Sequence, residues 1–243
     1  MSKNKQKEKC IYRRSGFVVF FVFCMLIFFG LSVWGLTSTI GTHLKGYSYL
    51  RPLKINMILQ IGGYGAATLT SFIAIFCVGN SKRYFPTTFL FLVVAFAFLR
   101  EFVNFLSAPA GQYGFTVFGV IFVLLLISSI FNIVAKSKHD DKKARVSYYL
   151  AFVALLALII YFVVSLIFTF KGLKELRANY AMLEKPYIKA AEGLEYEERH
   201  LWFISGAFQI MYVTTFLVPI FMTLLSIFPL FALLSPLRAI EKD

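Results

Sequence analysis

Long apolar runs, separated by short polar segments, fill most of the chain. Five of them reach the length that a transmembrane helix needs, about 20 residues for a hydrocarbon core of about 30 Å. These runs cover residues 16–37, 55–78, 86–106, 115–135 and 148–170. Apolar residues are continuous within each run and do not alternate, so the pattern predicts membrane-spanning helices and not the strands of a β-barrel.

A sixth apolar run covers residues 202–234 and is too long for one upright crossing, since at 1.5 Å per residue it would reach about 50 Å. Pro219 and Pro229 lie inside it, and proline removes a backbone donor and bends a helix. We expect one kinked span. With one kinked span the expected fold is an all-α bundle of six spans; the alternative for this last run, a short re-entrant pair broken at Pro219, stays open.

The composition excludes a soluble globular domain. Hydrophobic residues make up 59% of the chain and charged residues 15%, against about 45–50% and 25% in soluble proteins. A soluble body of this size could not bury so much apolar surface. The chain is therefore expected to be a multi-pass protein of the cell membrane.

Basic residues predict how the chain is threaded. With the N-terminus in the cytoplasm, Lys and Arg are more frequent in the inside segments than in the outside ones, which is the usual bias. Residues 1–15 then form a basic cytoplasmic tail, residues 16–238 one membrane domain and residues 239–243 a cytoplasmic C-terminal tail. No small-x-small cleavage site follows Trp34, so the first span is expected to be an uncleaved signal anchor.

The net charge of +13 follows from this threading and indicates a lipid partner. Cytoplasmic Lys and Arg attract anionic lipid headgroups, at about 1 kcal/mol per residue. A nucleic-acid partner is not expected, because no soluble segment is long enough to carry a basic binding face.

Ionisable residues inside a span are the best candidates for function. Such groups cost at least about 2.5–3.5 kcal/mol at mid-depth, and they usually face a cavity or a partner. The expected polar intramembrane cluster consists of Arg100, Glu101, Asn104, Gln60, Asn132 and Gln209. Two interpretations stay open: these residues line a polar path, or Arg100 extends to the headgroups while the others bond across helices.

Small residues in the second span indicate close helix packing. Gly62 and Ala66 form one small-x-x-x-small pair, and Gly63 and Ala67 form another. Such pairs let a second backbone approach closely. Packing within the bundle is the favoured interpretation, with a homodimer contact as the alternative.

The external loop 171–201 carries an apolar stripe on an otherwise charged segment, which predicts an amphipathic helix. Pro186 is expected to break it into two short helices. At the level of topology alone, six spans with cytoplasmic ends and two short helices between spans five and six resemble the permease subunits of ABC-2 type exporters. The resemblance implies a separate cytoplasmic ATPase subunit as a partner.

Motifs for catalysis are missing from the sequence. The three histidines are scattered in loops, and no phosphate-binding loop, nucleophile elbow or intramembrane acidic cluster occurs. An enzyme is therefore not expected, and neither is a cofactor or a metal. The favoured function is a transport or permease-type subunit that works with partner proteins. The alternative is a non-transporting assembly, scaffold or regulatory protein.

Overall fold

All regular secondary structure in the described part of the chain is helical. The computed structural model describes residues 14–39, 48–80, 86–100, 103, 113–138, 141–195 and 197–240. In chain order the elements are α1 (Arg14–Thr39), the 3₁₀ helix η1 (Ser48–Leu50), α2 (Arg51–Asn80), α3 (Pro86–Ala97), α5 (Tyr113–Lys138), α6 (Asp141–Lys171), α7 (Leu173–Ala191) and α8 (Glu197–Ile240). No strand occurs in these ranges, which confirms the all-α prediction.

Five helices are long and apolar enough to cross a membrane: α1, α2, α5, α6 and α8. They contain the expected spans 16–37, 55–78, 115–135, 148–170 and 202–234. The third expected span, 86–106, begins with α3, whose 12 residues reach about 18 Å and do not cross a bilayer by themselves. Beyond α3 the structure describes this span only to Arg100 and at Val103. A complete third span, and with it a total of six crossings, therefore stays a prediction.

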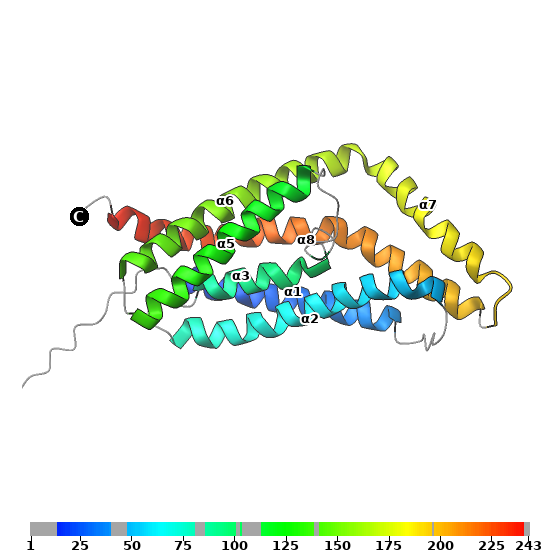
Figure 1. Ribbon diagram of the computed structural model, residues 1–243, viewed down its shortest axis with the longest axis horizontal. Helices are drawn as coiled ribbons and strands as arrows, with labels where there is room; N and C mark the ends of the chain where they lie inside the picture. The colour runs from blue at the N-terminus through cyan, green and yellow to red at the C-terminus, as the bar shows by residue number, and fades with distance from the viewer. Residues whose placement is uncertain are drawn as a thin grey trace, which may run out of the picture.

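The last helix, α8, is continuous over 44 residues. The alternative of a re-entrant pair broken at Pro219 is therefore wrong. Pro219 removes a single backbone hydrogen bond, with the carbonyl of Thr215, which a long helix tolerates. Two threonines near it bond to their own helix: Thr215 Oγ1 donates to Met211 O at 2.7 Å, and Thr223 Oγ1 donates to Pro219 O at 2.8 Å. Figure 1 shows α8 running along most of the long axis of the molecule.

The prediction of two short helices between the last two spans is also wrong. One helix, α7, covers Leu173–Ala191 and contains Pro186 in its last turns. A proline here removes a single hydrogen bond, with the carbonyl of Met182. Met182 itself is 58% exposed, and the helix continues through the proline to Ala191.

The helices form a closed ring. Each of α1, α2, α3, α5 and α6 packs against the next in this order, and α8 packs against both α6 and α1. Figure 1 shows the start of α1, the ends of α2 and α5, the start of α6 and the end of α8 at one end of the molecule, with α7 at the other. The start of α1 and the end of α8 therefore lie at the same end of the bundle.

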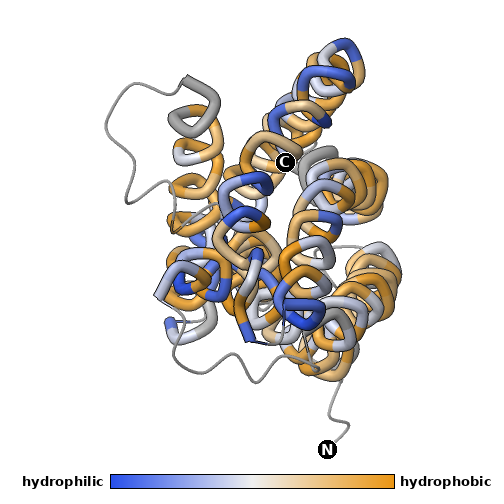
Figure 2. The backbone as a smooth tube through the Cα atoms, turned by 90° about the vertical axis from the view of Figure 1, so that its right-hand side faces the viewer, coloured by the Kyte–Doolittle hydropathy of each residue, from blue (hydrophilic) through white to orange (hydrophobic). Residues whose placement is uncertain are grey.

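Apolar side chains, aromatic and aliphatic, both fill the ring and cover its outside. Phe20, Phe21 and Phe28 of α1 are at most 1% exposed and belong to the same core as Phe98 and Phe162. Outward-facing residues are apolar as well; Ile58 and Phe168, for example, are both 69% exposed. Figure 2 shows apolar residues along the outside of the helices, as expected of a surface that meets lipid.

A second core lies at the α7 end of the molecule. It joins Leu50 of η1 and Met57 of α2 to Ala191 of α7 and to Phe203 and Ile204 of α8. At the edge of this core a hydrogen bond connects η1 to α8, with Tyr49 OH 2.5 Å from His200 Nδ1. We refer to η1, the first turns of α2, α7 and the part of α8 up to Met211 as the cap.

One of the two small-residue pairs lies at a helix contact. A Cβ added at Gly63 would be 2.5 Å from the carbonyl oxygen of Phe96, so α2 and α3 approach as closely as a glycine allows. Ala67, one turn later, is fully buried. In contrast, Gly62 is exposed with no heavy atom within 4 Å of its added Cβ, and Ala66 is half-buried.

Candidate binding cavity at Arg100

Arg100 follows α3 at the level where the bundle meets the cap, and its side chain is half-buried. Its Nη1 donates to Gln60 Oε1 on α2 at 3.5 Å, which is a long hydrogen bond. Val93, Val94 and Ala97, one and two turns earlier, are buried in the main core and fix the end of α3. Arg100 therefore points into the molecule, toward α2.

Gln60 is the centre of a buried polar cluster. The side chain is 5% exposed, and its Nε2 donates to Thr214 Oγ1 at 2.5 Å and to Tyr64 OH at 3.1 Å. With its nitrogen directed at these two oxygens, the amide presents its own oxygen to Arg100. The cluster thus joins α2, the end of α3 and α8 through side chains.

Tyr180 brings the cap helix α7 to the same place. Its hydroxyl lies 3.0 Å from Thr215 Oγ1, and its ring packs edge-to-face on Tyr212 with centroids 5.6 Å apart. Thr215 follows Thr214 directly on α8. One turn of α8 therefore carries both the partner of Gln60 and the partner of Tyr180.

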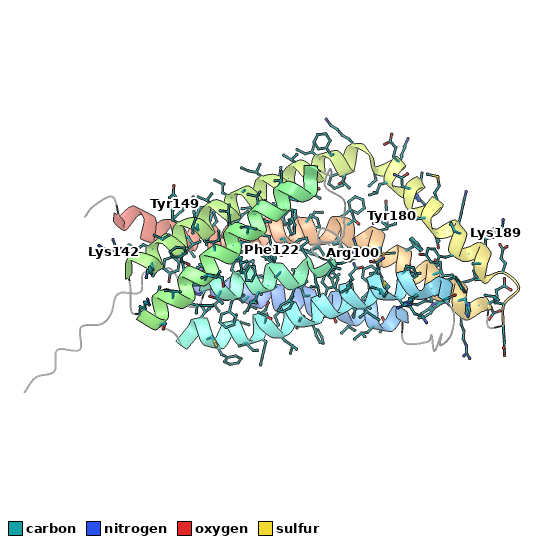
Figure 3. All side chains as sticks on the ribbon, viewed as in Figure 1. Arg100, Phe122, Lys142, Tyr149, Tyr180 and Lys189 are labelled. Carbon is teal, nitrogen blue, oxygen red and sulfur yellow. The ribbon has the colours of Figure 1, made fainter. Side chains whose placement is uncertain are left out.

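Two cavities adjoin at Arg100 and Tyr180, which line both. The first, about 250 Å³, lies within the ring between α3, α5, α6 and α8. Its lining combines hydroxyls and aromatic rings: Tyr64, Ala97, Phe98, Arg100, Phe118, Tyr161, Phe162, Ser165, Tyr180, Thr214, Thr215, Val218 and Pro219. The second, about 280 Å³, lies under α7 and is lined by Leu53, Asn56, Arg100, Tyr180, Leu183, Tyr187, Phe208 and Met211. Figure 3 shows Arg100 and Tyr180 in the region between α3, α7 and α8.

The structure brings together only two members of the expected polar cluster, Arg100 and Gln60. Glu101 and Asn104 lie outside the described residues. Gln209 is exposed on α8. Asn132 is buried elsewhere, where its Oδ1 accepts a hydrogen bond from Thr88 at 3.1 Å.

Asn132 borders a second polar cluster, which connects α3, α5 and α6. Ser128 Oγ donates to Ser147 O and Ser147 Oγ donates to Ser128 O, both at 2.7 Å. Thr87 Oγ1 lies 2.9 Å from Ser147 Oγ. Since these oxygens bond one another, the cluster is a helix-packing device, with each bond contributing about 0.6 kcal/mol.

The cap contains a carboxyl group, that of Glu184, whose pKa is shifted by its surroundings. Glu184 lies one turn after Tyr180 on α7 and is half-buried. Partial burial raises the pKa of Glu184, because a low-dielectric surrounding disfavours the carboxylate. Within the described ranges, no group of three or more His, Cys, Asp or Glu side chains could hold a metal ion.

Sequence reasoning missed the residues that complete the cavity, above all Thr214, Thr215 and Tyr180. Threonines are frequent in membrane helices, and nothing in the sequence distinguishes Thr214 from the others. Tyr180 belonged to the apolar stripe that the sequence shows on α7, but its hydroxyl partner is 35 positions away. These contacts depend on how the helices are rotated in the bundle.

The fold and the site together define a multi-pass α-helical membrane protein with a polar cavity inside the bundle. No protein-family model matches the chain, and neither a curated protein nor a solved structure proved significantly similar to it.

Proposed function

We propose that this protein is a six-span transport or permeation subunit of the cell membrane, with both ends in the cytoplasm. Residues beyond α3 complete the third crossing in this proposal. Lys142, Lys143 and Arg145 begin α6 at the end of the bundle where α8 also ends. The positive-inside bias favours that end as the cytoplasmic one, where these residues attract anionic lipids.

One observation carries the proposal: Arg100 lines a cavity inside the bundle and bonds to a buried glutamine. A guanidinium that only reached for lipid headgroups would lie on the outside of the ring. Placing it in the interior costs several kcal/mol unless the surrounding groups are polar. Gln60, Tyr64 and Thr214 meet that condition, which supports a solvated path between the helices.

The test is the accessibility of the cavity to water. In a background of Cys10→Ser, Cys24→Ala and Cys77→Ser, Ser165→Cys places a thiol in the cavity. We expect it to react with a membrane-impermeant charged thiol reagent added outside intact cells. Ala154→Cys, on the same helix but fully buried in the apolar core, is the matched control and should react at least about tenfold more slowly.

The two functions differ in the side from which the thiol reacts. A transport path requires that Ser165→Cys also react from the cytoplasmic side, measured in inverted vesicles. Reaction from one side only, or from neither, would contradict transport and favour the non-transporting assembly protein. Tags at both ends should be detected only after permeabilisation, which checks the proposed threading.

A partner is part of this proposal, because the chain has no nucleotide-binding motif. We expect a cytoplasmic ATPase or another membrane subunit to co-purify in mild detergent at a stoichiometric ratio. Mass spectrometry of the purified complex identifies it. Recovery of the chain alone from gently solubilised membranes would contradict the partner and leave only passive permeation.

A further inference from the structure

We propose that the cavity at Arg100 binds an anionic group, a phosphate or a carboxylate, with Arg100 and Asn56 as its principal donors. The anion belongs either to a lipid headgroup or to a small soluble molecule. This inference rests on the proposed function, because it names the ligand class of the same cavity.

Charge and donor geometry favour an anion. Arg100 alone carries a charge among the described residues that line the two cavities. Asn56 lines the second cavity one turn before Gln60 on α2, so its amide lies on the same side of the helix as the bond that orients Arg100. A guanidinium and an amide on neighbouring helices offer several N–H donors to one oxyanion, and charge-assisted bonds of this kind are the strong ones.

Gln60 prepares Arg100 for this role. Its Nε2 is held by Thr214 and Tyr64, which turns the amide oxygen toward Arg100 and restrains the guanidinium. A donor that is already oriented loses less conformational entropy when a ligand binds. Gln60 is therefore a positioning residue and not a contact for the ligand.

Cavity size and lining limit the rest of the ligand. The two spaces of about 250 and 280 Å³ each correspond to about eight or nine water molecules, at about 30 Å³ per water. Such a space holds a headgroup or a small organic anion but not a whole phospholipid. Phe98, Phe118 and Phe162 form the apolar side of the first cavity, where the carbon part next to the anionic group can pack.

The experiment measures ligand binding to the full-length protein in mild detergent by native mass spectrometry. One arm titrates phosphatidic acid against phosphatidylcholine of the same chains; a second arm adds sn-glycerol 3-phosphate, a soluble phosphate monoester. Arg100→Gln is compared with Lys189→Gln, which removes the same charge from an exposed position on α7. Phosphatidic acid should bind the wild type and the Lys189 variant equally, and Arg100→Gln about tenfold or more weakly.

Two further variants guard against a loss that reflects misfolding. Arg100→Lys retains the charge and should recover part of the affinity, while Ser165→Trp leaves Arg100 intact and fills the first cavity. We expect both to elute as the wild type does on size exclusion, with Ser165→Trp weakening binding. If glycerol 3-phosphate displaces the lipid, the ligand is the free anion; if it does not, the ligand is the lipid headgroup. Equal binding of phosphatidic acid and phosphatidylcholine, or binding that ignores both Arg100 and Ser165 substitutions, would overturn the proposal.

This outcome is separate from that of the proposed function. If the thiol of Ser165→Cys reacts from both sides but the protein does not prefer an anionic ligand, the proposed ligand class is contradicted and the transport proposal stands. If the protein binds an anion but the thiol reacts from one side only, the ligand class stands and the transport proposal is contradicted.

Discussion

Gln60 and Thr214 lie 154 positions apart in the chain, yet Nε2 of Gln60 donates a hydrogen bond of 2.5 Å to Thr214 Oγ1 inside the membrane bundle. Thr214 Oγ1 in turn donates to the carbonyl of Ile210 in its own helix at 2.8 Å. The contact fixes the rotation of α8 relative to α2 and keeps the glutamine oxygen directed at Arg100. It connects the packing of the bundle to the cavity.

The Gln60–Thr214 bond should appear as a coupling energy. We expect Gln60→Leu and Thr214→Val each to lower the free energy of unfolding, and a double-mutant cycle to give about 0.6 kcal/mol of coupling, at most about 1.7 kcal/mol. Unfolding in detergent mixtures of rising denaturing strength measures it. Gln209→Leu is the control, since Gln209 is exposed on α8 and its loss should change stability by less than about 0.5 kcal/mol. A coupling energy of zero would contradict the bond.

Gly63 and Gly62 should respond in opposite directions to the same substitution. Gly63→Ala places a Cβ 2.5 Å from the backbone oxygen of Phe96, so α2 and α3 must separate, at a cost of about 1–3 kcal/mol. Gly62→Ala meets no atom within 4 Å and gains helix propensity, up to about 1 kcal/mol. Thermal unfolding of the purified protein measures both. Equal effects at the two positions would contradict the close approach of α2 and α3.

Much of the fold follows from hydropathy along the chain. The spans at α1, α2, α5 and α6 are visible in the sequence because water and lipid separate apolar runs from charged ones regardless of how the helices pack. The rotation of a helix about its own axis cannot be read from the sequence when the helix is apolar on nearly all sides, as α8 is. Gln209 and Thr214 differ by five positions, or about 140° around a helix, and only the packing decides that Thr214 faces Gln60 while Gln209 faces outward.

Pro186 marks a second limit of the sequence. Proline is read as a helix break because it removes one hydrogen bond and crowds the preceding turn. The surroundings decide whether a helix tolerates that loss. At Pro186 the residues one turn earlier are exposed, and the packing of Tyr187, Ile188 and Ala191 into the cap core holds α7 together past the proline.

Ser147 should stabilise the crossing of α5 and α6. Its hydroxyl donates to Ser128 O at 2.7 Å and lies near Thr87 Oγ1, so Ser147→Ala removes bonds to two helices. We expect a loss of about 1 kcal/mol in the free energy of unfolding, at about 0.6 kcal/mol per bond. Ser137→Ala, at an exposed position of α5, should leave stability unchanged. If both variants unfold alike, the reciprocal serine bonds do not contribute.

Glu184 should make the cap less stable as the pH rises. Partial burial raises the pKa of this carboxyl above its value in the unfolded chain, about 4.3. Any stability that the protonated form contributes is fully present below that pH and is lost as the pH rises through the folded pKa. Glu184→Gln cannot ionise, so we expect its melting temperature to exceed that of the wild type at pH 7 and to match it near pH 3.5. The control, Glu195→Gln, changes an exposed carboxyl and should follow the wild type across the range. A Glu184→Gln variant that melts below the wild type at pH 7 would show that the carboxylate is stabilising and that its burial is not the dominant effect.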